Sequence, residues 1–127
     1  MEKIKSFTDL VAWEKGHQLV ISIYKATNNF PRKEIFALTN QMCRCAISIT
    51  SNIAEGFSRK GDKEKIQFYY MSLGSLTELQ NQLLIARDIH YLPKDEFNKL
   101  AEQTIEVSKL VNGLIRSLKN EDNELNT

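Results

Sequence analysis

The chain has 127 residues, 42% of them hydrophobic and 26% charged, which is the length and composition of one globular domain. These fractions exclude a disordered or fibrous protein. The net charge of +1, from 17 basic and 16 acidic residues, gives no strong overall field that would recruit nucleic acid or an anionic membrane. Two prolines and five glycines leave long stretches uninterrupted, which favours helices.

The first helix is predicted over residues 7–28. Ser6 and Asp9 have the spacing of a capping box at its start, and the run Asn28 to Pro31 ends it because proline cannot continue a helix. Its apolar face is predicted to contain Leu10, Trp13, Gly16, His17, Val20, Ile23 and Tyr24.

The second helix is predicted over residues 33–57, where apolar residues recur at steps of three and four. This repeat is typical of a helix in a bundle. Its members are Ile35, Leu38, Met42, Cys45 or Ala46, Ile49 and Ile53. The helix ends in a basic turn that Gly56 and Gly61 flank.

The third helix is predicted over residues 62–90, with Asp62 as its cap. Its apolar face is predicted to contain Ile66, Tyr69, Leu73, Leu76, Leu83 and Ile89 or His90.

The fourth helix is predicted over residues 93–119. Pro93 suits its first turn, where Asp95 and Glu96 are favoured by the helix dipole. Its apolar face is predicted to contain Phe97, Leu100, Thr104, Val107, Val111, Leu114 and Leu118. Residues 120–127 are polar, and we expect a frayed tail there.

Short connections between long helices imply antiparallel neighbours. The sequence therefore predicts an all-α fold, a single domain over residues 1–127 that forms an up-down-up-down antiparallel four-helix bundle.

Location follows from the N-terminus and the cysteines. The first residues lack the apolar stretch of a signal peptide, and the longest uncharged run, residues 66–77, is far short of a membrane span. Cys43 and Cys45 lie two apart on a predicted helix, so they point to nearly opposite faces and cannot pair with each other. We expect a cytoplasmic protein with reduced thiols and no membrane association.

Motifs for enzymatic chemistry are incomplete in this sequence. Glu14 and His17 form one Glu-x-x-His, but a di-metal bundle needs two such motifs, and His90 has an arginine three positions before it. Neither cysteine has a histidine near it in sequence, and the isolated glycines form no phosphate-binding loop. We expect no metal, no cofactor and no enzymatic activity.

A polar run lies within the second helix, beside its apolar face. It comprises Ser48, Ser51, Asn52 and Glu55. Polar groups near a core need partners, so we expect a structural role, with Ser75, Glu78 or Trp13 as partners inside the chain. A ligand site is the alternative.

Charge is uneven along the chain. Residues 1–66 hold 11 basic and 7 acidic residues, a balance of +4, whereas residues 67–127 hold 6 and 9, a balance of −3. The densest basic cluster is Arg59, Lys60, Lys63 and Lys65, at the turn into the third helix. In a monomer it reads as a solvated helix end, but repeated around a ring it would become a positive surface for phosphates.

Ordered motifs over about residues 6–92 resemble a known family. They are residues 7–15 (FTDLVAWEK), Phe30-Pro31 with Glu34, residues 41–56 (QMCRCAISITSNIAEG), Arg59, and Gly74-Ser75 with Glu78-Leu79. The family is that of four-helix bundle proteins encoded in intervening sequences of bacterial 23S rRNA genes. Similar proteins serve as accessory variability determinants of diversity-generating retroelements.

The resemblance implies a bundle that assembles into a homopentameric ring. The retroelement relatives bind a reverse transcriptase and its RNA through basic surfaces, whereas the ribosomal intervening-sequence members have no established activity. The sequence departs from the pattern at Cys43, where a second arginine often precedes Arg44, at Cys45, where alanine is common, and at Thr50, where proline is common.

Two functions remain open from the sequence. In the first, the protein is an oligomeric accessory that binds RNA or DNA, with phosphate contacts from Arg44, Arg59, Lys60, Lys63 and Lys65. In the second, it is a self-associating helical scaffold or protein-interaction module that binds no nucleic acid.

Overall fold

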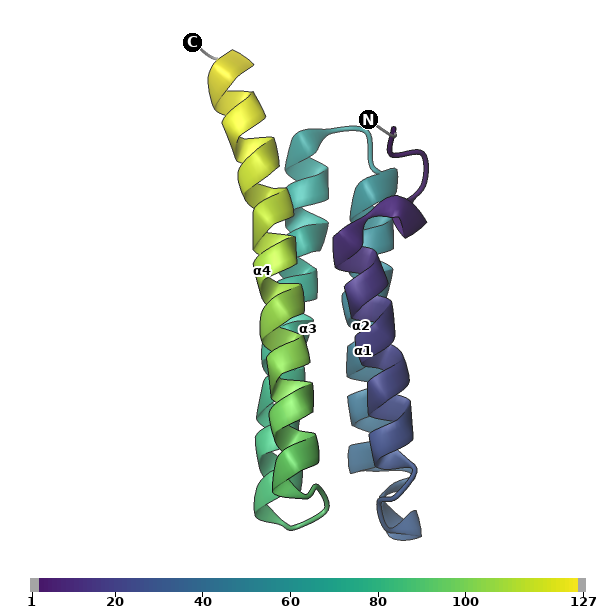
Figure 1. The fold of residues 1–127 in the computed structure, drawn as a ribbon. Helices are drawn as coiled ribbons and strands as arrows, with labels where there is room; N and C mark the ends of the chain where they lie inside the picture. The colour runs from purple at the N-terminus through teal and green to yellow at the C-terminus, as the bar shows by residue number, and fades with distance from the viewer. Residues whose placement is uncertain (1–2, 126–127) are drawn as a thin grey trace.

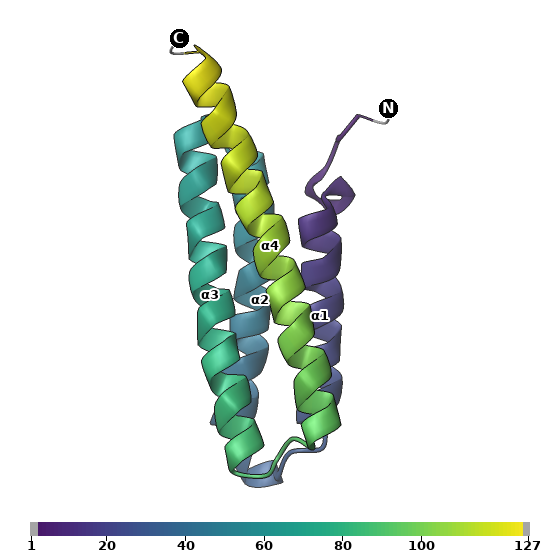
Figure 2. The ribbon, with the colours of Figure 1, turned by 60° about the vertical axis from the view of Figure 1, so that its left-hand side comes forward.

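Four helices that alternate in direction make up the fold in the computed structural model, which describes residues 3–125 (Figures 1 and 2). They are α1 (Val11–Thr27), α2 (Leu38–Ser58), α3 (Asp62–Asp88) and α4 (Lys94–Leu125). Two short 3-10 turns, η1 (Phe7–Asp9) and η2 (Arg32–Glu34), precede α1 and α2. The described part of the chain contains no strand, so the predicted all-α bundle is confirmed.

Each helix packs mainly on two neighbours, in the cyclic order α1, α2, α3, α4. Four grooves therefore run along the outside of the bundle, and each is named here by the two helices that form it. The turn between α2 and α3 lies at the same end of the bundle as the first described residues and the end of α4 (Figure 1). The connections from α1 to α2 and from α3 to α4 lie at the opposite end (Figure 1).

The predicted capping box exists, but it caps η1 and not α1. Ser6 Oγ accepts a hydrogen bond from the Thr8 N–H at 3.3 Å, and Asp9 Oδ2 accepts one from the Ser6 N–H at 3.1 Å. Leu10 then adopts an extended backbone, so α1 begins at Val11 and not at residue 7.

The start of the second helix is also later than predicted. Residues 32–34 form the 3-10 turn, and the irregular backbone of Ala37 (φ −125°, ψ −109°) separates it from α2, which begins at Leu38. Ile35 therefore lies outside the helix and is 46% exposed, so its assignment to the apolar face was wrong.

The core agrees with most predicted apolar faces, with corrections at their edges. Leu19, Leu79 and Ile115 are buried although the predicted faces omitted them. Tyr24 and Ile89 are about half exposed, and His17 and His90 are exposed as well, although the predicted faces included them. Ile89 caps the end of α3 and no longer follows the helical repeat, whereas Tyr24 lies at the outer edge of the face that it shares with Val20.

The last helix is longer than predicted. The backbone remains helical through Leu125, where a frayed tail was expected from residue 120, because no glycine or proline interrupts residues 119–125. The last two positions of that predicted tail lie outside the described residues. Between residues 3 and 125, no helix has the length and apolar character needed to cross a membrane.

Candidate nucleic-acid interface

The predicted basic cluster lies at the α2–α3 turn, at one end of the bundle. Arg59 follows the last residue of α2, Lys60 lies in the turn, and Lys63 and Lys65 fall in the first turn of α3. Four cations within seven positions therefore lie at one end of the molecule, but their side chains make different contacts.

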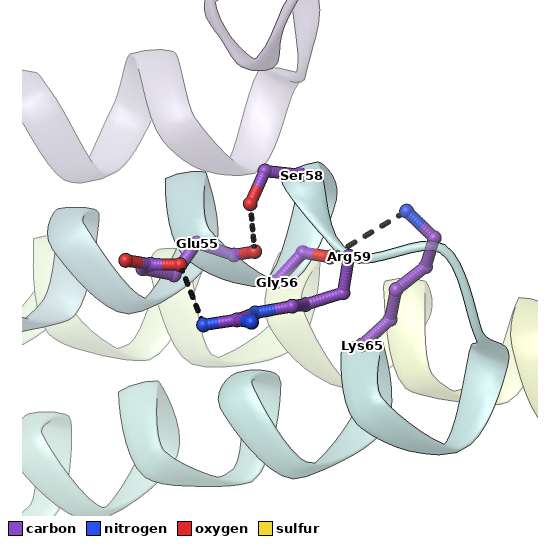
Figure 3. Close-up of polar contacts among 5 residues, drawn as sticks. All are labelled: Glu55, Gly56, Ser58, Arg59 and Lys65. Atoms are coloured by element: carbon purple, nitrogen blue, oxygen red, sulfur yellow. Dashed lines mark hydrogen bonds and ion pairs between the residues drawn. The ribbon is translucent and has the colours of Figure 1, made fainter.

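Lys65 holds the end of α2. Its Nζ donates to the carbonyl oxygen of Phe57 at 2.6 Å and to that of Gly56 at 3.5 Å, and it lies 5.3 Å from the centre of the Phe57 ring. Figure 3 shows this side chain reaching from α3 back to the last turn of α2. A cation there stabilises the carbonyls that a helix leaves unpaired at its C-terminus. The structure thus gives Lys65 an internal role that the sequence analysis did not predict.

Arg59 is held in place but remains accessible. Its guanidinium pairs with Glu55 at 3.2 Å, with both side chains about half exposed, and lies 4.7 Å from the centre of the Phe68 ring. The backbone carbonyl of Glu55 also accepts a hydrogen bond from Ser58 Oγ at 2.7 Å (Figure 3). An exposed ion pair of this kind is worth well under about 1 kcal/mol, so a phosphate can compete for Arg59.

Lys60 and Lys63 are exposed, and neither forms an ion pair with any other described residue. Gly61, the N-cap of α3, provides no side chain to cap the first N–H groups of that helix. Free N–H groups at a helix start favour anions. The accessible part of the cluster is therefore Arg59, Lys60 and Lys63.

Arg44 does not belong to this surface. It lies on α2, 15 positions before Arg59, which is about 22 Å at the rise of an α-helix. It lines the α2·α3 groove together with polar side chains that include Gln41, Ser48 and Glu78. The five predicted phosphate contacts thus divide into an end cluster and a separate arginine in a groove.

One of the four members of the predicted polar motif, Ser48, joins α2 to α3, and a second, Asn52, bonds to Ser48 within α2. Ser48 Oγ lies 2.9 Å from Ser75 Oγ, and Asn52 Nδ2 donates to the Ser48 carbonyl at 2.8 Å and to Ser48 Oγ at 3.1 Å. Ser75, one of the partners suggested by the sequence, is therefore the partner in the structure. Ser51 and Glu55 are exposed.

A further polar contact between these helices was missed by the sequence analysis. Ser72 is fully buried, and its Oγ donates to the carbonyl of Ile49 at 2.9 Å. The available signal was its position, since Ser72 lies three residues after Tyr69 and four before Leu76, on the buried face of α3.

Neither cysteine is placed for nucleophilic chemistry. Cys45 donates to the Ser75 carbonyl at 3.0 Å, and burial, with a smaller contribution from Glu78, raises the pKa of its thiol to about 12. The thiol therefore stays protonated at neutral pH. Cys43 is buried with its Sγ 3.6 Å from Thr27 Oγ1, and the two cysteines are not bonded to each other.

His17 of the Glu-x-x-His motif contacts an aromatic ring. Its ring stacks on that of Trp13, with centroids 4.8 Å apart and planes 15° from parallel. Across the part of the chain that the structure describes, no group of three or more His, Cys, Asp or Glu side chains is arranged to hold a metal ion.

Comparisons with known proteins found one matching family model and a similar solved structure. A family model described as 23S rRNA-intervening sequence protein matches residues 8–113. A similar solved structure is a protein of unknown function from the S23 ribosomal protein family of Bacteroides thetaiotaomicron VPI-5482. The TM-score is 0.74 at 21% identity, over 83% of this chain and 98% of that one. At this identity the likeness shows the fold alone. No match was found among curated proteins.

Proposed function

Because the chain belongs to the family of 23S rRNA-intervening sequence proteins, we propose that it is a non-enzymatic RNA-binding accessory that works as an oligomer. The observation that carries this proposal is the set of accessible cations at the end of the bundle, Arg59, Lys60 and Lys63, beside the uncapped start of α3. Contacts of this kind bind phosphates without reading a sequence. The two reduced, buried cysteines fit the cytoplasm as the proposed location.

One copy of the cluster is a weak site. Three phosphate contacts give a log–log salt slope of only about −2 on single-stranded RNA. The resemblance implies five copies, a ring of about 73 kDa from five chains of 14.6 kDa. Repetition of a weak patch raises its affinity for long RNA through effective concentration. The proposal therefore links RNA binding to self-association.

Sequence preference should be small. Two aromatic rings contact the cluster, those of Phe57 and Phe68, and each already has a cation placed over it, Lys65 and Arg59 respectively. Free aromatic faces are what single-stranded nucleic acids use for stacking. DNA phosphates would be contacted in the same way, and a reverse transcriptase is the protein partner that the likeness to retroelement proteins implies.

Fluorescence anisotropy with unrelated RNAs, between about 50 and 200 mM salt, tests the proposal. The double variant Lys60→Ala/Lys63→Ala should bind more weakly to every RNA, with a salt slope reduced by about 1.4 for each subunit in contact. The matched control is Lys33→Ala/Lys94→Ala, which removes two exposed lysines at the opposite end and should bind as the wild type does. Absence of binding at the low-salt end, with the oligomer intact, would overturn RNA binding.

A self-associating scaffold that binds no nucleic acid is the second candidate. One observation favours it. Lys65 is bonded to backbone carbonyls and Arg59 is paired with Glu55, so that only two cations of the basic cluster, Lys60 and Lys63, are left without a partner among the described residues. An intact oligomer with no affinity for any RNA would support this function.

A further inference from the structure

The α1·α4 groove differs from the other three grooves of the bundle. Lys15 of α1 pairs with Glu106 of α4 at 3.6 Å, and Lys25, Glu96 and Lys99 line the same groove. Among the large apolar side chains that are at least two-fifths exposed, Val11 alone shares the helix face of Lys15, four positions before it. These charged side chains are typical of a surface that remains exposed to solvent.

The α1·α2 groove is lined by both polar and apolar side chains, and it carries a run of exposed apolar residues. Tyr24, Ile35 and Cys43 line one stretch of it, and Ile47 lies one helical turn beyond Cys43 on the same side of α2. Ile21 lies one turn before Tyr24 on α1. The four large side chains other than Cys43 are each 41–49% exposed.

The α3·α4 groove is apolar. Leu84 and Ile105 line it together with Phe97 and Ala101. Farther along, Tyr70 of α3 is held against α4, because its hydroxyl accepts a hydrogen bond from Lys119 at 2.8 Å. Tyr70, Leu84 and Ile105 are each 43–49% exposed.

The α2·α3 groove has apolar residues as well, with Phe36 in its lining, Met71 and Ile85 exposed along α3, and Ile89 exposed just after α3. Its middle is polar, however, because Arg44, Ser48 and Glu78 gather there. This surface lies between the α1·α2 and α3·α4 grooves.

The cyclic order of the helices places the α1·α2 and α3·α4 grooves on opposite sides of the bundle. A molecule with two different adhesive faces on opposite sides associates head to tail, and such a chain of contacts closes into a ring when the rotation permits.

Charge distinguishes this arrangement from the packing of like faces. The α1–α2 hairpin, residues 1–61, has nine basic and five acidic residues, a net charge of +4. The α3–α4 hairpin has eight basic and eleven acidic residues over positions 62–127, a net charge of −3, and eight of each over positions 62–120, whose side chains the structure describes. Contact between two α1–α2 hairpins brings like charges together, whereas contact between unlike hairpins does not.

We propose that copies of this chain associate by packing the α1·α2 groove of one copy onto the α3·α4 groove of the next, with the α1·α4 groove left in solvent. This inference rests on the self-association in the proposed function, and it specifies which two surfaces of the bundle form the contact between copies. Ile21, Tyr24, Ile35 and Ile47 of one copy meet Tyr70, Leu84 and Ile105 of its neighbour.

Single aspartate substitutions test the assignment by light scattering on a sizing column. Ile47→Asp and Ile105→Asp each place a charge in one contact face, so each variant should elute as a monomer of 14.6 kDa. Val11→Asp is the matched control, because Val11 is 54% exposed and lies toward the α1·α4 groove. It should keep the mass of the wild type. Circular dichroism should show unchanged helix content for all three variants.

An equimolar mixture of the two monomeric variants distinguishes head-to-tail from like-face packing. Ile47→Asp keeps an intact α3·α4 groove, and Ile105→Asp keeps an intact α1·α2 groove, so one sound contact can form between them. The mixture should give a heterodimer of about 29 kDa, two chains of 14.6 kDa, and nothing larger. A dimer formed by either variant alone would overturn head-to-tail packing.

A second pair of variants and the mass of the wild type complete the test. If either substitution reduces the helix content, Tyr24→Asp and Leu84→Asp place the same charge in the same two grooves. A wild-type oligomer that Ile47→Asp and Ile105→Asp leave intact would overturn the assigned faces and spare the proposed function. A monomeric wild type at micromolar concentration would instead overturn the self-association itself.

Discussion

His90 has a left-handed backbone, with φ of 65°, and no other non-glycine residue in the described chain has a positive φ. The His90 N–H donates to the Arg87 carbonyl at 3.0 Å, and the Tyr91 N–H donates to the Ala86 carbonyl at 2.9 Å. These two bonds form a Schellman motif, in which the left-handed position is usually glycine. The chain therefore ends α3 with a residue whose Cβ makes that conformation costly.

Replacement of His90 by glycine should therefore stabilise the protein. Relief of the left-handed strain is worth about 1 kcal/mol, which should raise Tm by a few degrees in thermal unfolding. The control is His90→Ala, which removes the imidazole but keeps the Cβ and should stay within about 0.5 kcal/mol of the wild type. Equal stability of the glycine and alanine variants would show that the strain is not relieved at this position.

The sequence predicted the hydrogen-bond role of Ser75 but not that of Lys65, and the difference has a physical reason. Ser75 was predicted as a partner of the polar motif because both lie on regular helices, where spacing fixes the face. The bonds of Lys65 to Gly56 and Phe57 depend on how the chain reverses at the turn, and periodicity carries no information about that. His90 was missed for the same reason, since no glycine marked the end of α3.

At the scale of elements, α2 and α3 approach each other closely at Gly56. A Cβ built there would lie 2.7 Å from Cε1 and 2.9 Å from Cδ1 of Tyr69, which is buried and cannot easily move. Gly74, in the middle of α3, is exposed and has no atom within 4 Å of such a Cβ. The same substitution should therefore have opposite effects at these two positions.

Gly56→Ala should destabilise the protein by about 1–3 kcal/mol, because the extra methyl overpacks the contact with Tyr69. Gly74→Ala should stabilise it by up to about 1 kcal/mol, because alanine has the higher helix propensity. Denaturant unfolding measures both differences. A Gly56→Ala variant as stable as the wild type would mean that the helices separate there without cost.

The helices themselves were predictable because their apolar repeat is long and regular. The starts of the first two helices were not, since Phe7 and Arg32 begin segments whose local hydrogen bonds form 3-10 turns before the α-helix starts. The sequence also did not show which cations of the basic cluster are accessible and which form contacts within the chain. Arg44 fell outside the cluster because 15 helical positions separate it from Arg59.

For the whole molecule, the distribution of charge and apolar surface matters more than their totals. A net charge of +1 conceals hairpins of +4 and −3, and apolar side chains lie in the grooves that join helices within each hairpin. The accessible cations of the basic cluster lie at one end of the bundle, away from the middle of those grooves. Self-association along the grooves would therefore leave the basic ends free and on a common rim.

Self-association should make thermal stability depend on protein concentration, because unfolding then also separates the subunits. For five subunits, a hundredfold rise in concentration should add about 2 kcal/mol per chain, four-fifths of the RT ln 100 that one binding event provides. Differential scanning calorimetry between about 2 and 200 µM should therefore show Tm rising by several degrees for the wild type and for Val11→Asp. Ile47→Asp, which keeps the bundle but loses one contact face, should melt at the same temperature throughout. If the wild type melts independently of concentration, the bundle is stable alone and its apolar grooves need another occupant.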